Sequence, residues 1–282
     1  MITCNLMGGL GNQLFQIFTT ISYAIKKHKQ FKFLYTETLG GGVTIIRNTY
    51  WNSFLYNLKP FLIKELPKDM KIIKEKDFTF NELDINEVSQ EDIFLFGYFQ
   101  SYKYFQPYYD MLIRIINLET QKNDLKQKLD LSEKYFDNKI SMHFRLGDYK
   151  KLQHVYTLST YEYYERALNK IITMTEKDDF TILYFCEDED EEDVFKTIHR
   201  LEEKFTTCKF ERGEKNLVDW KQLLTMSLCR HNIIANSSFS WWGAYFNSNK
   251  NKIVCYPSSW FSETCTHNTK DLCPPEWIKV DI

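Results

Sequence analysis

The sequence contains no long apolar run, and this absence argues against a membrane-spanning helix. No window approaches the roughly 20 apolar residues that a membrane-crossing helix requires. The opening residues, MITCNLMGGLGNQLF, also lack the basic stretch followed by an apolar run that marks a secretory signal peptide. We therefore expect a cytoplasmic protein without a transmembrane segment, and we leave open whether it attaches peripherally to a membrane.

Paired cysteine motifs are also missing. The seven cysteines are odd in number, widely spaced and never arranged as C-x-x-C, and four of them stand in apolar runs. Such a set fits reduced, buried thiols better than a disulfide framework. The same spacing argues against a zinc site.

A strong excess of either charge is absent as well. The formal net charge is −2, which argues against the broad basic surface of a nucleic-acid-binding protein. What is present is ordinary for a globular protein, with 43% hydrophobic and 26% charged residues. The 282 residues suit one large domain or two smaller ones.

In the second half of the sequence, short apolar strands alternate with amphipathic helices. Runs such as TILYFC and NIIAN are typical of strands buried on both faces of a sheet. The alternation predicts βαβ units and a parallel sheet. The expected strands are 140–145, 181–186, 209–210, 232–236 and 251–257, which is the last, and the expected helices are 160–174, about 190–204, 217–229 and one from about Ser240.

The first half gives a weaker pattern. Residues 39–90 combine an LGGG loop, an uncertain helix at YWNSFLYNL and a charged remainder that we expect to be irregular. The other expected elements are strands at 2–6 and 31–35, a helix from about Asn12 to His28, a strand at 92–101 leading into a helix through about Asn117, and a surface helix within 119–138.

No internal repeat and no low-complexity linker separates the two halves. We place a domain boundary near Asn138, where the charged stretch ends and the cleaner alternation begins. This predicts an N-terminal lobe over 1–138 and a C-terminal Rossmann-like lobe over 139–282.

Ligands of parallel α/β sheets collect at the carboxyl ends of strands, and four such ends carry unusual residues. The first is LMGGLGNQLF (6–15), where Gly9 and Gly11 let the backbone approach a ligand and Asn12 adds a polar tip. The segment is neither a phosphate-binding loop with Gly-Lys-Ser/Thr nor a complete dinucleotide fingerprint. An ordinary tight turn explains it equally well.

The second is SMHFRLGDYKK (141–151), a strand with a polar end. Arg145 is always charged and can grip a phosphate through two hydrogen bonds, and His143 points to the same face of the strand. Asp148 is then a candidate base or the partner of Arg145. The alternative is a structural Arg–Asp pair beside a turn.

The third is the acidic run in FCEDEDEED (185–193). Asp188, Glu189 and Asp190 spell the D-x-D with which metal-dependent sugar transferases hold a divalent ion, but an acidic run produces this match easily. We interpret the run as the start of the following helix, where acids complement the helix dipole.

The fourth is IIANSSFSWWGAYF (233–246). Asn236, Ser237 and Ser238 follow a buried strand and precede a helix, where hydroxyls and amides can cradle a pyrophosphate. A plain serine N-cap is the alternative. Trp241 and Trp242 are better explained by packing than by stacking on a sugar.

Together, GGLGNQLFQ, HFRLGDY and HNIIANSSFSWWGAYF resemble, in order and spacing, the α-1,2-fucosyltransferases of glycosyltransferase family 11, and the resemblance extends to YPSSWF (256–261). It implies a GT-B-like α/β fold of two Rossmann-type lobes with parallel sheets and a donor cleft between them. It also implies inverting transfer of L-fucose from GDP-fucose to O2 of a galactose, without a metal or other cofactor. The expected partners are GDP-fucose and a galactose-terminated oligosaccharide, glycolipid or glycoprotein glycan.

The resemblance also implies roles for single residues. Arg145 would bind the pyrophosphate and His143 would support the donor pocket. Asp219 resembles an acid that reads guanine in related enzymes. The family often carries a second basic residue where Leu146 stands, so Arg145 could be the sole arginine on the phosphates. The phosphates would also be held by Ser237, Ser238 and the amide of Phe239, beside Asn236. In the N-terminal lobe, on the acceptor side, Gly9, Gly11 and Asn12 would face the fucose.

The implied reaction needs a stabilised leaving diphosphate and an activated hydroxyl. Arg145 would supply the first through its charge. Asp148 is the expected base, although it could instead orient Arg145, and a dissociative reaction would need little base. Two other readings stay open: a transferase for another nucleotide sugar, and a carbohydrate-binding protein without activity.

Overall fold

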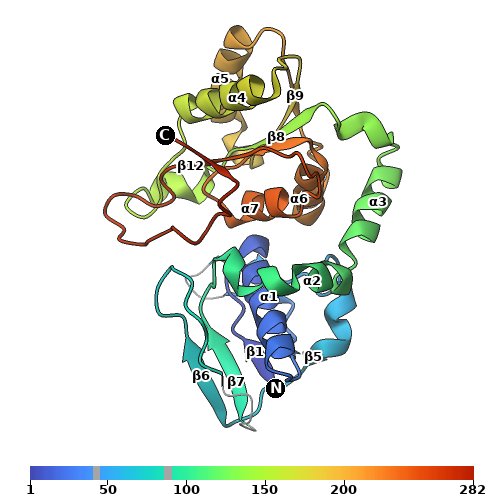
Figure 1. The fold of residues 1–282 in the computed structure, drawn as a ribbon, viewed down its shortest axis with the longest axis vertical. Coiled ribbons are helices and arrows are strands. Elements are labelled where there is room, and N and C mark those ends of the chain that lie inside the picture. The colour runs from blue at the N-terminus through green and yellow to red at the C-terminus, as the bar shows by residue number, and fades with distance from the viewer. Residues whose placement is uncertain (41–44, 86–90) are drawn as a thin grey trace. The chain divides into compact units, whose positions relative to one another are not determined.

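A computed structural model describes residues 1–40, 45–85 and 91–282 of the chain. The chain divides into two compact units (Figure 1), Met1–Gln121 with His267–Pro274 and Lys122–Thr266 with Pro275–Ile282. The division falls after Gln121, within helix α3 (Leu118–Lys128), and not near Asn138. A short segment near the C-terminus returns to the first unit, which the expected lobe over 1–138 did not include.

The first unit has a three-stranded parallel sheet with the strand order β1-β7-β6, formed by β1 (Ile2–Cys4), β7 (Asp92–Phe96) and β6 (Met70–Lys74). Helix α1 (Leu10–Lys26) follows β1 and has a nearly continuous run of buried residues. It begins slightly earlier than expected, directly after the glycine turn. Gly8 has a φ of +74°, the left-handed region that glycine adopts at little cost.

Strand β6 corrects the expectation that the charged part of 39–90 is irregular. Its sequence MKIIK places lysines on an exposed edge strand, so it lacks the continuous apolar run of a buried strand. The uncertain helix at YWNSFLYNL is a set of turns followed by a 3₁₀ helix over Tyr56–Phe61. Of the LGGG loop, Leu39 ends a short strand and Gly40 follows it, while residues 41 and 42 lie outside the described ones.

The remaining elements of the first unit are short. The predicted strand at 31–35 is present as β2, and the continuous helix expected before Asn117 is interrupted around Pro107 by 3₁₀ turns. These elements are β2 (Phe33–Leu34) paired with β5 (Leu62–Ile63), the hairpin β3 (Thr38–Leu39) with β4 (Arg47–Asn48), and helix α2 (Tyr109–Ile115).

The second unit contains a six-stranded sheet with the order β10-β9-β8-β11-β12-β13, and each neighbouring pair of strands in this order is parallel. The strand order reverses direction between β8 and β11, as in doubly wound sheets. The strands are β8 (Lys139–His143), β9 (Thr181–Phe185), β10 (Lys209–Arg212), β11 (His231–Ile233), β12 (Val254–Pro257) and β13 (Ile278–Val280).

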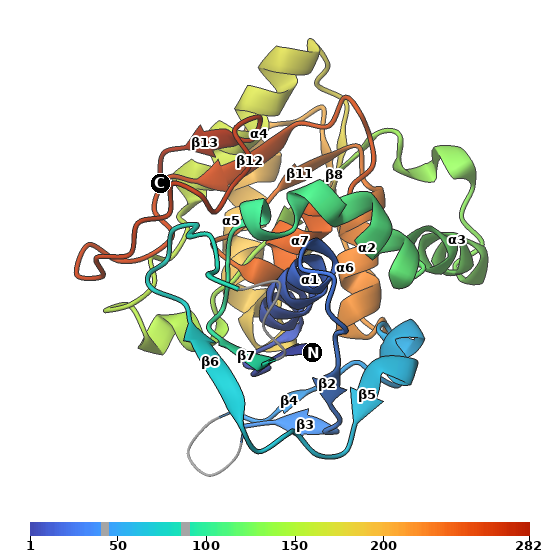
Figure 2. The same ribbon diagram turned by 60° about the horizontal axis from the view of Figure 1, so that its bottom comes forward.

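The predicted helices of this unit are all present. They are α4 (Tyr161–Thr175), α5 (Glu191–Lys204), α6 (Asp219–Leu228) and α7 (Ser238–Tyr245). In Figure 1, α4 and α5 lie on one side of the sheet and α6 and α7 on the other. Figure 2 shows β13 beside β12. The strand at 251–257 is not the last, because the short β13 adds to the edge of β12.

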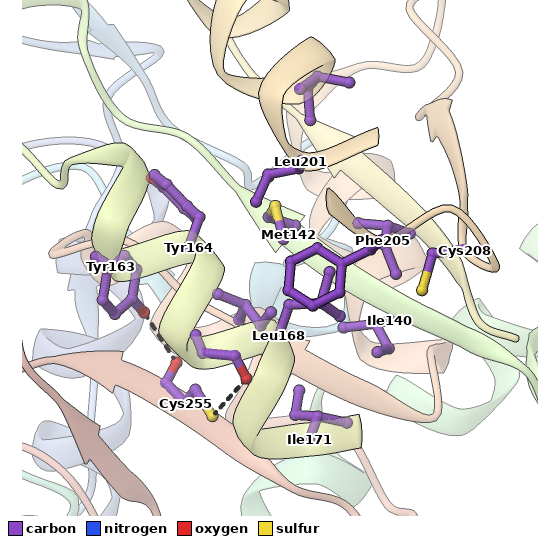
Figure 3. Packing of buried hydrophobic residues seen from close by; sticks show 14 of the residues in the cluster. Ile140, Met142, Tyr163, Tyr164, Leu168, Ile171, Leu201, Phe205, Cys208 and Cys255 are labelled. Carbon is purple, nitrogen blue, oxygen red and sulfur yellow. Dashed lines mark hydrogen bonds between the residues drawn. The ribbon is translucent and has the colours of Figure 1, made fainter. Parts of the chain in front are cut away.

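The period-two alternation of β8 divides its side chains between these two layers. Ile140 and Met142 belong to the apolar core that contains α4 and α5 (Figure 3). Ser141 instead accepts a hydrogen bond from Asn232, and the His143 ring lies 5.7 Å from the Phe239 ring of α7. Ser141 and His143 of β8 therefore face the α6 and α7 layer.

The α/β class with parallel sheets in two units is confirmed, while the donor cleft between the lobes stays a prediction. Within the described ranges, no helix combines the length and apolarity needed to cross a membrane.

Candidate functional site

The carboxyl ends of β8, β9, β10 and β11 meet at one edge of the second unit's sheet, because these strands are parallel. His143 ends β8, with Arg145 and Asp148 beyond it, and the acidic run follows β9. Asp219 opens α6 after β10, and the Asn236–Phe239 segment follows β11. The sequence-predicted residues of this unit thus share one edge.

Arg145 is held between two carboxylates. One terminal nitrogen, Nη2, donates to Asp148 Oδ1 at 2.6 Å, and Nη1 contacts Glu187 Oε1. The guanidinium carbon also lies 5.2 Å from the centre of the Tyr149 ring. Burial lowers the pKa of Arg145, but the charges of Glu187 and Asp148 outweigh burial and raise it above its usual value. The guanidinium is therefore charged and oriented.

His143 is a neutral imidazole at neutral pH. Burial lowers its pKa to about 3, and the positive charge of Arg145 acts in the same direction. Its Nδ1 is buried and has no hydrogen-bond partner among the described residues. This state suits a hydrogen-bonding role beside Arg145 and not proton transfer at pH 7.

The acidic run after β9 anchors the turn that follows Arg145. Asp190 is 2% exposed. Its carboxylate accepts hydrogen bonds from the amide of Gly147 at 2.5 Å and from Lys150 Nζ at 2.8 Å. Asp188 pairs with Arg212 at 2.5 Å. Acids also fill the first turn of α5, as predicted. Both aspartates of the D-x-D thus pair with basic side chains.

These anchoring contacts were missed by the sequence reasoning. Gly147 and Asp190 are 43 positions apart, and Arg145 and Glu187 are 42 positions apart. The only available signal was the neighbouring placement of β8 and β9, which brings their two following loops together. In the part of the chain that the structure describes, no group of three or more His, Cys, Asp or Glu side chains could hold a metal ion.

The serine loop begins α7 with an N-cap. Ser237 Oγ accepts from the amide of Phe239 at 3.3 Å, a long hydrogen bond. Asn236 is fully buried and donates to the carbonyls of Thr157 and Trp260 at 2.7 and 2.8 Å. Its amide group therefore ties three loops together, and the phosphate contacts of Ser237, Ser238 and Phe239 stay a prediction.

The aromatic pair of α7 is part of the core. Trp241 and Trp242 are both 0% exposed, and Trp241 packs against Tyr245 and Trp277. This confirms packing over sugar stacking for both rings. Asp219, in contrast, is exposed at the start of α6, where Oδ1 accepts from the amide of Trp220 at 2.7 Å.

In the first unit, the glycine turn is fixed by amide side chains. Gln13 donates to the carbonyls of Gly8 and Asn48 at 3.0 and 2.9 Å. Asn12 Oδ1 accepts from Gln100 Nε2 at 2.7 Å. Gly9 precedes α1, and Gly11 lies within its first turn. The turn is thus an ordered polar end of β1, and its contact with a sugar stays a prediction.

These features define an α/β protein with charged and polar side chains gathered at the ends of parallel strands. The family model for glycosyl transferase family 11 matches residues 1–281, and the chain belongs to this family. It is therefore a glycosyltransferase of the family that the three sequence motifs indicated.

Two curated relatives from Escherichia coli are similar to the chain. An alpha-1,2-colitosyltransferase is 27% identical and the alignment covers 100% of this chain and 99% of the relative. The O-antigen biosynthesis glycosyltransferase WbnK is 28% identical over 66% of this chain and 60% of its own length.

Among solved structures, an Arabidopsis thaliana FUT1 mutant in complex with GDP matches with a TM-score of 0.48 and 10% identity, over 90% of this chain and 69% of that one. An Escherichia coli ADP-heptose LPS heptosyltransferase II matches with a TM-score of 0.36 and 15% identity, over 57% of this chain and 43% of that one.

Proposed function

We propose that the protein transfers L-fucose from GDP-fucose, with inversion, to the 2-hydroxyl of a galactose in a glycan acceptor. Arg145 carries the proposal, because it places a permanent positive charge at the strand-end edge of the sheet. A guanidinium there can stabilise the charge that grows on a departing diphosphate. The neutral His143 beside it would support the same group.

Asp148 has two proposed roles. As a base it would accept the proton of the acceptor hydroxyl. Its contact of 2.6 Å with Arg145 supports the alternative that it orients the guanidinium. The exposed carboxylate of Asp219 would read guanine, and the turn at Gly9, Gly11 and Asn12 would face the sugar.

We further propose that no metal takes part. The D-x-D carboxylates support this view, since Asp188 pairs with Arg212 and Asp190 pairs with Lys150 and the Gly147 amide. These partners would have to be displaced before the carboxylates could bind a cation.

A second candidate donor is GDP-colitose. The relative whose alignment spans the whole chain is named an alpha-1,2-colitosyltransferase. Colitose is an L-fucose that lacks the 3-hydroxyl, so both sugars would use the same diphosphate contacts. Only a hydrogen bond to O3 would separate them.

The test measures sugar transfer to galactose-terminated acceptors from GDP-fucose, GDP-colitose and a UDP-sugar, in the presence of EDTA. We expect the enzyme to use GDP-fucose. The Arg145→Ala variant should have a kcat/KM that is lower by roughly 10²-fold or more, and its melting temperature should stay within a few degrees of the wild-type value. Linkage analysis of the product identifies the 2-hydroxyl.

Three results contradict parts of the proposal. Near-normal turnover by Arg145→Ala overturns the assignment of the diphosphate site. Use of a UDP-sugar alone overturns the donor, and sugar binding without any transfer favours the carbohydrate-binding alternative. Loss of activity in EDTA that returns with a divalent cation overturns metal independence.

A further inference from the structure

The two carboxylates on Arg145 leave its surroundings negatively charged. The guanidinium contributes +1, and Asp148 and Glu187 contribute −1 each, so the three groups sum to −1. A diphosphate is itself an anion. The two carboxylates therefore weaken the attraction of a diphosphate to the guanidinium, and withdrawal of one of them would strengthen it.

Glu187 is the carboxylate that is able to withdraw. It reaches Arg145 from the loop after β9, and its side chain is 46% exposed, against 30% for Asp148. Asp148 stands three positions after Arg145 within the same turn, so it is fixed beside the guanidinium. Among the described residues, the Arg145 contact is the one hydrogen bond or ion pair that the Glu187 side chain makes.

The loop that carries Glu187 does not have to move with its side chain. The Glu187 carbonyl accepts from the amide of Asp190 at 3.1 Å, and Asp190 is fixed in turn by Gly147 and Lys150. Rotation about the side-chain bonds of Glu187 alone would therefore release the guanidinium.

The close approach of Glu187 also depends on a residue of the motif. A Cβ added to Gly147 would lie 2.3 Å from Glu187 Oε2. Any larger residue at this position would push the carboxylate away from Arg145. The glycine of HFRLGDY thus leaves room for the carboxylate.

We propose that Glu187 sets the affinity of the site by competing with the diphosphate for Arg145. Its carboxylate leaves the guanidinium when the nucleotide sugar binds and returns when GDP departs, which weakens GDP binding and speeds its release. This inference rests on the proposed function, because it takes Arg145 as the diphosphate ligand.

The test compares Glu187→Gln with the wild type and with the matched control Glu189→Gln. Glu189 lies in the same acidic run, is exposed and makes no ion pair within the described part of the chain. GDP affinity is measured by titration calorimetry at low salt, and the GDP dissociation rate by stopped flow. Guanosine serves as the uncharged ligand.

We expect Glu187→Gln to bind GDP roughly tenfold more tightly and to release it more slowly, since an uncharged amide competes poorly for a guanidinium. Glu189→Gln should change GDP affinity less than twofold. Guanosine affinity should be unchanged in both variants, because the competition concerns the diphosphate alone.

GDP binding by Glu187→Gln that is equal to or weaker than wild type, at an unchanged melting temperature, overturns the inference. If Glu187→Gln does not fold, Glu187→Asp replaces it. The shorter carboxylate reaches Arg145 less well and should tighten GDP binding by a smaller factor, and unchanged or weaker binding again contradicts competition.

The proposed function fails in a different way. A wild-type chain that binds no GDP, or an Arg145→Ala variant that binds it as tightly as wild type, overturns the diphosphate site itself and the competition with it. GDP binding that depends on Arg145 but not on Glu187 overturns the competition alone.

Discussion

At the scale of single residues, the turn after β8 is held by a side chain far away in sequence. Asp190 is buried and satisfies both the Gly147 amide and the Lys150 ammonium. Gly147 has a φ of +25°, a conformation that side-chain-bearing residues adopt only with strain. The orientation of Arg145 therefore depends on a carboxylate that is not part of the motif.

Removal of this carboxylate should destabilise the protein. Asp190→Ala leaves the Gly147 amide without its acceptor and removes one of the two carboxylates bonded to Lys150, which we expect to cost about 2–3 kcal/mol of unfolding free energy. Urea denaturation measures this loss. Asp193→Ala is the control, since Asp193 is an exposed partner of the same lysine. Equal losses in the two variants would contradict an anchoring role for Asp190.

At the scale of elements, side chains form hydrogen bonds with the backbone at both ends of α7. Ser237 caps its beginning, and the ammonium of Lys252 donates to the carbonyls of Ala244 and Asn247 at 2.8 and 2.7 Å. Buried Lys122 donates to the carbonyl of Phe246 at 2.7 Å. Positive charge at a helix C-terminus is favourable because the carbonyls there lack partners in the helix. These lysines fix the helix that carries the serine loop.

Lys252→Met tests this stabilisation while keeping most of the side chain's length. Burial lowers the pKa of Lys252 to about 8, although the Glu276 carboxylate opposes the shift, so the side chain is still mostly charged at pH 7. We expect Lys252→Met to lose about 1–2 kcal/mol of unfolding free energy at pH 7. The exposed neighbour Lys250, changed to Met, should lose much less. Indistinguishable urea midpoints for the two variants would contradict the C-terminal cap.

How far the sequence predicted these elements depended on burial. Strand β9 is an apolar run and was predicted to within one residue of its observed bounds, whereas β11 was expected over 232–236 and forms over His231–Ile233. Strand β6 was missed because an exposed edge strand tolerates lysine, and β13 because three residues give no periodicity. Arg145 and its motif stood out in the sequence. The contacts of Glu187 and Asp190 did not, because they arise only from the pairing of β8 with β9.

At the scale of the whole molecule, the groups that respond to acid are divided between the two units. His143 and His231, both buried and with lowered pKa values, lie in the second unit. Asp271 lies in the first unit, on the returning segment. Burial raises its pKa, but hydrogen bonds from Lys103 and the Phe80 amide outweigh burial and lower it. The histidines therefore make the unfolding free energy depend on pH from just below neutral pH, whereas Asp271 does so only at much lower pH.

The second unit should therefore lose stability first on acidification. Burial lowers the pKa of His143 to about 3 and that of His231 to about 4, both below the usual value of 6.5. Below pH 6.5 the unfolded chain takes up protons that the folded chain does not. The unfolding free energy therefore decreases as the pH is lowered, until the pH reaches the pKa values of the folded histidines. At pH 5 the loss is about 2 kcal/mol for each histidine relative to pH 7.

Hydrogen exchange at pH 7 and pH 5 measures this difference within one molecule. Peptides from β8 and β11 should lose protection at pH 5, while those from β1 and β7 should keep more of theirs. His143→Asn should remove about half of the pH dependence, and the exposed His154, changed to Asn, should leave it unchanged. Equal loss of protection in both units, or an undiminished pH dependence in His143→Asn, would show that the buried imidazoles do not govern acid stability. The neutral state assigned to His143 beside Arg145 would then be wrong as well, since both follow from the same burial.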